Sequence, residues 1–346
     1  MSTTQERSLC RGCGAEIAAS FLDCPVCHRL VHGAELTRLA AEARQAEEQG
    51  DLTTALGTWR KTLELLPSGT TQRATIEGQM QKLGAMIDGR APRPAKDGRQ
   101  GGKAAGVIAG TGAAGAMLIK FKALLVPVLA NAKFLLLGLF KLPTLLSMMV
   151  FAQVGGGGHL GFWIGLTAAI YVHEIGHVAT LRRYGIEASA PMFVPGLGAL
   201  VRMKQYPTDA HEEARTGLAG PLWGLFASAV ALGLGVAIGS PTALFVASTS
   251  ASINVFNLIP VWQLDGSRGL KALSTFERVI VGVAAIAVGV VTRQRMPAVV
   301  GVIVLGRLAF GKAHPTGDRR VLALFLALVV LHPACAWVAD RLIGGA

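Results

Sequence analysis

The amino-acid sequence predicts an all-α polytopic membrane protein that begins with a small polar region. Of its 346 residues, 51% are hydrophobic, and the mean hydropathy of +0.47 is too high for an ordinary soluble domain. Residues 1–103 carry 14 Lys and Arg against 12 Asp and Glu, whereas residues 104–346 carry 19 against 9. Basic residues beside apolar segments typically mark the cytoplasmic ends of membrane spans. We therefore expect about six or seven transmembrane helices in the second region.

The same composition excludes several classes of protein. The apolar content is too high for a disordered chain, the 43 Gly show no triplet period, and five Cys are too few for a disulfide-stapled secreted domain. The pI near 9.9 could suggest a nucleic-acid partner. Because almost all the excess positive charge lies beside apolar segments, we expect no nucleic-acid binding.

Residues 1–33 contain a C-x2-C-x10-C-x2-C pattern, made by Cys10, Cys13, Cys24 and Cys27. Two such pairs on tight turns can place four thiolates around one Zn²⁺, and the metal replaces the core that so short a segment lacks. We expect a structural zinc ribbon without catalysis, since four thiolates leave no open coordination position. The alternative is a set of reduced or redox-active thiols. The segment has no signal-peptide core, which predicts a cytoplasmic N-terminus.

Residues 34–88 are expected to be helical and to form a helix pair. Residues 34–49 are rich in Ala, Glu and Arg and are followed by a break at Gly50-Asp51, and Pro67 ends the next run. The spacing resembles one tetratricopeptide repeat, used elsewhere for protein contacts; an ordinary helical hairpin is the alternative. We expect a regulatory protein as a partner of this N-terminal region. Residues 89–103 are expected to form a flexible linker.

The second region consists of apolar runs with polar breaks. Residues 104–141 are expected to form either an interfacial helix or a first, weakly apolar span. The clearer candidate spans are Leu142–Val154, Leu160–Leu181, Thr216–Ile238, Thr242–Leu264, Val279–Val291, Pro297–Leu308 and Val321–Val338. We expect a multi-pass protein of a bacterial inner membrane, with a core at residues 142–274 and C-terminal transmembrane helices at 275–346.

One candidate span contains an HExxH motif, His173-Glu174-Ile175-Gly176-His177. On an α-helix, residues i and i+4 lie on one face, so both imidazoles can bind one metal while Glu174 borders the same face as a base. The alternative is a pair of hydrogen-bonded interior histidines. That alternative must bury Glu174 among apolar residues, which is costly without a function.

A third metal ligand is expected at Asp265. Only nine acidic residues follow Lys103, and Asp265 closes an apolar segment in which Pro260 breaks the helix and Gly266 permits a tight turn. Asp265 can therefore return toward the end of the membrane where HExxH lies. The alternative is a simple helix-ending Asp-Gly turn.

HExxH in one apolar segment and N-x2-P-x4-D-G in a later one resemble the site-2 protease family of intramembrane zinc metalloproteases. Pro191–Val201 and Ala219-Gly220-Pro221 match further pieces of that family, and no PDZ insertion fits between residues 185 and 215. The resemblance implies zinc bound by His173, His177 and Asp265, Glu174 as catalytic base, and Asn257 as polariser of the scissile carbonyl.

The resemblance implies a zinc metalloendopeptidase that hydrolyses peptide bonds in or near transmembrane segments of membrane-protein substrates. Two zinc ions are expected, one catalytic and one in the ribbon. The Pro and Gly residues between Met192 and Arg202 suit a re-entrant β-hairpin, with substrate contacts at Met192, Phe193, Val194 and Gly198; a surface loop is the alternative. The alternative functions are a zinc-dependent membrane hydrolase of a non-peptide substrate and a non-catalytic membrane scaffold.

Overall fold

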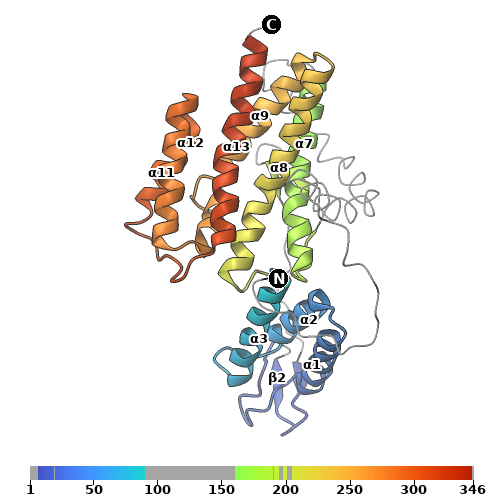
Figure 1. Ribbon diagram of the computed structural model, residues 1–346. Helices are drawn as coiled ribbons and strands as arrows, with labels where there is room; N and C mark the ends of the chain where they lie inside the picture. Colours follow the sequence, from blue (N-terminus) through green and yellow to red (C-terminus); the bar gives the residue numbers. More distant parts are fainter. Residues whose placement is uncertain are drawn as a thin grey trace, which may run out of the picture. The chain divides into compact units, whose positions relative to one another are not determined.

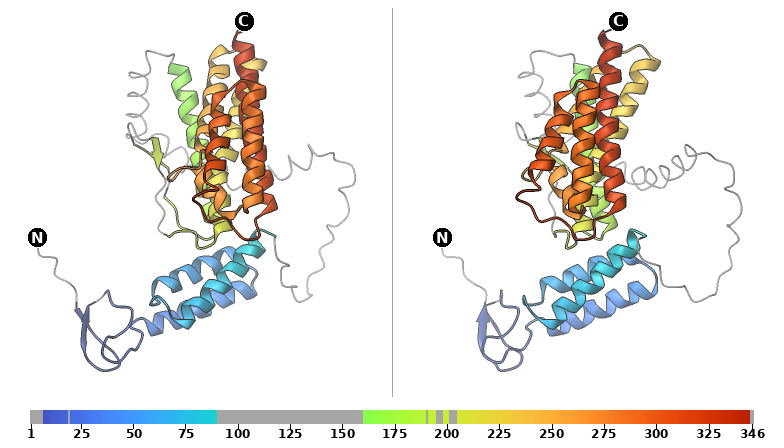
Figure 2. Two further views of the ribbon diagram at one scale, coloured as in Figure 1. Left: turned by 90° about the vertical axis from the view of Figure 1, so that its left-hand side faces the viewer. Right: turned by 60° about the vertical axis from the view of Figure 1, so that its left-hand side comes forward.

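The computed structural model describes residues 7–18, 20–89, 160–189, 191–194, 198–200 and 205–344. The chain divides into two compact units, traced in Figures 1 and 2. The N-terminal unit comprises Met1–Gly101 together with Arg182–Ile186, and the C-terminal unit comprises Gly102–Leu181 and Glu187–Ala346. The expected linker, the segment 104–141 and the candidate span Leu142–Val154 lie outside the described residues.

The N-terminal unit begins with a small β-hairpin. Strand β1 (Arg7–Leu9) pairs antiparallel with β2 (Glu16–Ala18), and Asp23 forms a further bridge with Leu30. Few apolar residues are buried here: a cluster of Cys10, Ile17 and Cys24. So small a core needs another source of stability, as the ribbon prediction requires.

Three helices follow the hairpin where the sequence predicted two. Helix α1 spans Gly33–Glu48, α2 spans Leu52–Glu64 and α3 spans Thr71–Ile87. The expected break at Gly50-Asp51 is confirmed, because Asp51 caps α2 by accepting the Thr54 N–H. The apolar residues of α2 that share one helix face are buried, namely Ala55, Leu56, Trp59 and Leu63, and so is Leu66 just after the helix. Helix α3 was missed as a separate element; it packs on α2 and buries Met80, Leu83 and Ile87.

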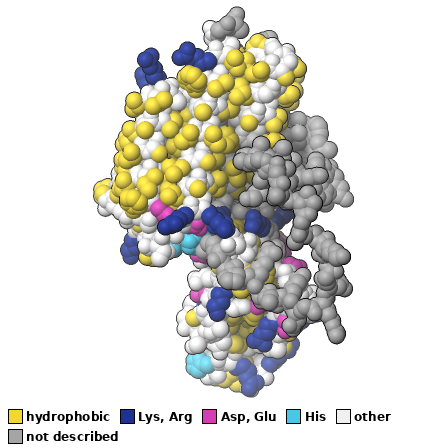
Figure 3. All heavy atoms as spheres, viewed as in Figure 1, with side chains coloured by type: hydrophobic (Ala, Val, Ile, Leu, Met, Phe, Trp, Pro, Cys, Tyr) yellow, Lys and Arg dark blue, Asp and Glu magenta, His cyan; other side chains and the backbone are white. Residues whose placement is uncertain are grey.

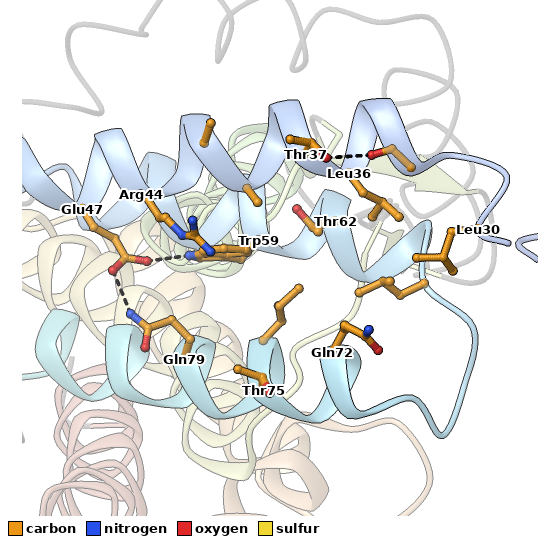
Figure 4. Close-up of a pocket in the computed structure, with 15 residues that line it drawn as sticks. Leu30, Leu36, Thr37, Arg44, Glu47, Trp59, Thr62, Gln72, Thr75 and Gln79 are labelled. Carbon is orange, nitrogen blue, oxygen red and sulfur yellow. Dashed lines mark hydrogen bonds between the residues drawn. The ribbon is translucent and has the colours of Figure 1, made fainter.

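A groove of about 910 Å³ lies among these three helices, as Figure 4 shows. At one end Glu47 of α1 accepts hydrogen bonds from Trp59 Nε1 of α2 at 2.5 Å and from Gln79 Nε2 of α3 at 2.7 Å. One carboxylate therefore joins all three helices.

The N-terminal unit also contains five residues that are distant in sequence, Arg182–Ile186. Tyr184 is 1% exposed and its hydroxyl hydrogen-bonds Asp88, while Arg60 donates to the Tyr184 carbonyl. Gly185 has φ +67°, and a Cβ there would lie 2.6 Å from the backbone nitrogen of Gly57. This close backbone approach requires glycine at both positions, and nothing in the sequence pattern predicts it.

The C-terminal unit is a bundle of apolar helices. Its elements are α7 (Leu160–Arg183), α8 (Ala210–Ala237), α9 (Pro241–Asn257), the short α10 (Asp265–Gly269), η1 (Leu270–Ala272), α11 (Thr275–Thr292), α12 (Arg295–Gly306) and α13 (Arg319–Gly344). Helix α8 packs on α9 and α13, and α11 packs on α12. One core joins them, with fully buried residues such as Leu218, Leu258 and Phe325.

The outer surface of this unit is apolar. Figure 3 shows hydrophobic side chains over its helices, with Lys and Arg gathered at the two ends of the apolar zone. Within the described residues, α8, α11 and α13 are long and apolar enough to cross a membrane, and α12 is apolar but shorter. Exposed residues such as Val236, Val291 and Leu331 suit lipid contact. These findings support a membrane protein, while the count of six or seven spans stays a prediction.

Two local features lie where the sequence indicated them. The apolar segment expected over Thr242–Leu264 stops being helical at Asn257, and the non-helical stretch to Leu264 contains Pro260. Strands β3 (Met192–Val194) and β4 (Gly198–Leu200) pair antiparallel, with Met192 opposite Leu200. The expected β-hairpin is therefore present.

Candidate functional site

Helix α7 carries both histidines of HExxH on one buried face. His173 and His177 are 4% and 8% exposed, and their Nε2 atoms lie 3.1 Å apart. The helix has no interruption between them, so the spacing of four residues brings the two imidazoles together edge to face, with ring centroids 4.9 Å apart. The sequence expectation of two convergent imidazoles is realised in the fold.

Asp265 is brought to the same point from a distant part of the chain. It is the first residue of α10, and its two carboxylate oxygens lie 3.2 Å from His173 Nε2 and 3.3 Å from His177 Nε2. A Cβ at Gly266 would collide with the backbone of Leu258, at the end of α9. Gly266 is therefore required for this close backbone approach, and it lies inside α10 rather than in the tight turn that the sequence suggested.

Hydrogen bonds to the other imidazole nitrogens determine which tautomers are present. His177 Nδ1 donates to the Thr216 carbonyl at 2.8 Å. The Asn254 amide donates through Nδ2 to the Ser250 carbonyl at 2.8 Å, so its Oδ1 faces His173 Nδ1 at 2.7 Å and accepts from it. Both Nδ1 atoms thus carry the protons. In the neutral imidazoles, both Nε2 atoms then present lone pairs toward each other and toward a carboxylate.

This donor set suits a metal cation. Two bare imidazole nitrogens and a carboxylate would repel one another at such distances without a positive charge between them. Within the described residues, the three side chains form a group whose ligand atoms all lie within 4.8 Å of one another. Two His and one Asp are ligands that Zn²⁺ takes, and three protein ligands leave one position for water. The residues present therefore fit zinc.

Small residues on α8 leave room for this cluster. A Cβ at Gly220 would collide with Nε2 of both histidines, and one at Gly224 would collide with the Asn254 amide. At Gly217, a Cβ would lie 2.6 Å from Arg268 Cβ and 3.0 Å from the Asp265 carbonyl. The spacing i, i+3, i+7 places these glycines on one face of α8. Only residues without side chains permit α8 to approach the cluster so closely.

Two further residues have expected catalytic roles. Glu174 lies on α7 with the two histidines, and Asn257 lies on α9 with Asn254. Glu174 follows His173 on α7 and is half-buried, and no hydrogen bond from a described residue reaches its carboxylate. Asn257 is the last residue of α9 and is half-buried. The hydrogen bond from α9 to the histidine pair comes from Asn254, one turn earlier.

Neither Asn254 nor the role of Gly220 was predicted from the sequence. The signal for Asn254 was available, because an amide in an apolar helix needs hydrogen-bond partners; Asn254 lies in the last turn of α9 and is 3% exposed. For Gly220 the only signal was its place in Ala219-Gly220-Pro221. The expected substrate-contact residues Met192, Phe193, Val194 and Gly198 lie on β3 and β4, of which the structure describes the backbone pairing.

The four N-terminal cysteines form the second group that could hold a metal. Cys10 Sγ lies 3.7 Å from Cys27 Sγ, and Cys13 Sγ lies 3.6 Å from Cys24 Sγ. The backbone N–H groups of Gly12 and Cys13 lower the pKa of Cys10 to about 6. The Ala15 N–H opposes the shift at Cys13, but the neighbouring sulfurs of Cys27 and Cys24 raise the pKa of its thiol to about 12. The arrangement fits a zinc ribbon.

Together, the apolar helices and the buried cluster of two His and one Asp define a membrane protein with a candidate metallopeptidase centre. Residues 161–243 match the model of peptidase family M50, which includes the site-2 proteases. The match contains HExxH and Gly220 and ends before Asp265. The resemblance expected from the sequence is thereby confirmed.

A curated relative agrees with this family. The chain is 29% identical over 121 residues to a zinc metalloprotease of Methanocaldococcus jannaschii. The alignment covers 32% of this chain and 35% of that protein, so the chain spans about a third of the relative's length. No solved structure matches the chain. The family match and the relative support a membrane metallopeptidase that uses zinc.

Proposed function

We propose that the protein is an intramembrane zinc metalloprotease that hydrolyses peptide bonds in or near transmembrane segments, as in regulated intramembrane proteolysis. The observation that carries the proposal is the convergence of two bare Nε2 atoms and a carboxylate inside a bundle of apolar helices. A buried cation site at such depth is costly unless it has a function. The placement expected is a bacterial inner membrane, with the N-terminus in the cytoplasm.

His173, His177 and Asp265 would hold the ion, and each residue has a defined task. Asn254 and the Thr216 carbonyl keep both imidazoles in the tautomer that presents Nε2. When bound, zinc supplies a Lewis acid that lowers the pKa of a water and polarises a carbonyl. Glu174 accepts the proton of the attacking water and returns it to the leaving amine. Asn257 donates a hydrogen bond to the scissile carbonyl as negative charge develops there.

The β3–β4 hairpin would hold the substrate in extended form. A transmembrane helix hides its carbonyls in its own hydrogen bonds, so it must unwind before hydrolysis. Backbone groups of Met192, Phe193, Val194 and Gly198 would pair with the unwound segment as an added strand. The substrate is then a membrane protein with a locally unstable helix.

The N-terminal unit would have a structural and binding role. A second zinc ion would stabilise the ribbon and its β1–β2 hairpin. Its ligands would be Cys10, Cys13, Cys24 and Cys27. The helical groove beside it would bind a regulatory protein, in place of a PDZ domain.

The Glu174→Gln variant tests the proposed reaction. The full-length protein is reconstituted in vesicles with a library of helical membrane substrates, and cleavage products and bound zinc are both measured. We expect Glu174→Gln to keep its zinc and to lose cleavage by at least about a hundredfold, because the amide keeps the shape but cannot take a proton. Glu213→Gln, which removes a peripheral ion pair with Lys271, is the matched control and should cleave normally.

Three results separate the alternatives. Full turnover by Glu174→Gln would refute the assigned base. Absence of peptide cleavage by the zinc-loaded wild type, together with hydrolysis of a lipid or another ester, would indicate a non-peptide substrate. Absence of any hydrolysis would indicate a scaffold.

A further inference from the structure

A third buried histidine of the bundle has no place in the reaction described above. His332 lies on α13 and is 0% exposed, and its Nε2 lies 2.9 Å from the carbonyl oxygen of Pro221 on α8. A carbonyl can only accept a hydrogen bond, so Nε2 carries the proton and donates. Within the described part of the chain, Nδ1 has no hydrogen-bond partner.

An imidazole is an unfavourable choice for this position as a packing residue. A buried nitrogen without a partner destabilises the folded state, and α13 is apolar enough to cross a membrane, where polar side chains are rare. Pro333, the next residue of α13, would be enough to kink the helix, so a kink does not require the histidine. A histidine at this position therefore needs an explanation. Its hydrogen bond to the Pro221 carbonyl is an interaction that an apolar residue could not make.

Pro221 occupies the weakest turn of α8. Proline has no N–H, so the carbonyl of Gly217 cannot receive the usual helical hydrogen bond from this position. This turn of α8 is instead held by contacts with other helices. A Cβ added at Gly176 of α7 would lie 2.5 Å from the Ala219 carbonyl, and Gly220 lies against the imidazoles of His173 and His177.

Three successive residues of α8 thus meet three different partners. Ala219 meets α7, Gly220 meets the two imidazoles, and Pro221 meets α13 through His332. The backbone of Gly220 borders the space beside the two Nε2 atoms. How far this turn of α8 extends into that space depends on the contact that α13 makes with it through His332.

We propose that His332 is a positioning residue, which holds the Gly220-Pro221 turn at the depth that leaves room for the metal. It acts through the Pro221 carbonyl and touches neither metal nor substrate. The inference rests on the proposed metal site, but it does not require that the substrate be a peptide. Removing the hydrogen bond lets the turn move, and displacements of about 0.5 Å are enough to impair a metal site.

The test compares two replacements of His332 in the full-length protein. His332→Gln keeps an N–H donor at about the same distance from the backbone, whereas His332→Leu keeps a similar size without a donor. Cys335→Ala is the control, since Cys335 is buried on the same helix and packs in a cluster with Ala251 and Ala336. Zinc is titrated out with a chelator in detergent, and thermal unfolding is followed on the same samples.

We expect His332→Leu to weaken zinc binding at the site of His173, His177 and Asp265 about tenfold, the scale of effect known for residues that support metal ligands. His332→Gln and Cys335→Ala should stay within about threefold of the wild type. In cleavage assays, the Leu variant should lose kcat while KM is unchanged. Unchanged zinc affinity in His332→Leu would overturn the proposal, and so would an equal loss in the Leu and Gln variants.

A double variant keeps the test decisive if His332→Leu unfolds. Pro221→Ala restores an N–H to the weak turn of α8, so the turn should depend less on α13. The Pro221→Ala, His332→Leu protein should therefore recover zinc affinity relative to His332→Leu in a folded protein. Absence of recovery in a folded double variant would refute the positioning role. Because zinc affinity is read without a substrate, failure of proteolysis would not affect this result.

Discussion

The two candidate metal sites of this protein are built in opposite ways. The cysteine cluster joins residues at most 17 positions apart, from Cys10 to Cys27, and two of its four thiols are exposed. The histidine and aspartate cluster joins residues 92 positions apart, from His173 to Asp265, and all three side chains are buried. The first site needs only a hairpin and two turns. The second needs four helices in register.

The difference also concerns chemistry. Four thiolates would close the coordination shell, so a metal bound in the ribbon would contribute only stability. Two imidazoles and one carboxylate leave a position open, and Glu174 lies beside them on the same helix. A site that only stabilises a fold can be formed by one short segment. A catalytic site has to hold several groups in fixed positions, so it is built from several packed helices.

The largest effect is expected for Gly220→Ala. The added methyl group would occupy the space between the two Nε2 atoms, so zinc should be lost from the membrane site and cleavage should fall by at least about a hundredfold. Gly233→Ala, on the same helix, is the matched control, because a Cβ there would have no neighbouring atom of a described residue within 4 Å. Metal content by atomic absorption and cleavage of a membrane substrate are measured together. Zinc retained at wild-type affinity would show that the cluster is not the metal site.

Replacing Cys10 and Cys13 by Ser should break only the local site. The ribbon should lose its zinc and its structure, while one zinc per chain remains in the C-terminal unit. Zinc stoichiometry and hydrogen exchange at Ile17 and Cys24 provide the measurement. If this variant lost all of its zinc, the two sites would not be independent and the comparison would fail.

A smaller loss is expected for Asn254→Ala. The hydrogen bond to His173 Nδ1 disappears and the tautomer is no longer determined, so zinc affinity should fall about 10- to 100-fold. Ser252→Ala, on the exposed side of α9, is the control. Chelator competition measures the affinity. A loss confined to kcat with normal affinity would instead assign Asn254 a direct role in the reaction.

The smallest effect is expected in the N-terminal helices. Hydrogen bonds from the Thr54 side chain and backbone lower the pKa of Asp51, which caps α2. Asp51→Ala should reduce the stability of this unit by about 1 kcal/mol, whereas Asp51→Asn, which keeps an acceptor, should lose less. Because the pKa is lower in the folded state, the contribution is present above about pH 4 and is lost as the pH falls. Hydrogen exchange at Thr54 and Ala55 checks both statements, and a stability of Asp51→Ala equal to wild type would contradict the cap.

Much of the fold could be predicted because its signals are local. The apolar face of α2, the break at Gly50-Asp51 and the helix end before Pro260 each follow from residues a few positions apart. The third helix, α3, was missed because its apolar residues are sparse and polar residues such as Gln79 and Gln81 separate them. The expected six or seven spans stay a prediction, since α8, α11 and α13 are the three described helices that are long and apolar enough to cross a membrane.

What the sequence by itself determined is the chemistry of both sites: four thiols in two turns, and two imidazoles and a base on one helix, with Asp265 as the expected third ligand. Spacing along a hairpin or helix converts directly into distance, so these groups could be recognised without a fold. Only the tertiary structure decided that Asn254 hydrogen-bonds His173, that Gly220 leaves the space beside the two Nε2 atoms open, and that His332 reaches Pro221. These contacts join helices far apart in the chain, and their distances depend on how closely the backbones pack, which no periodicity encodes.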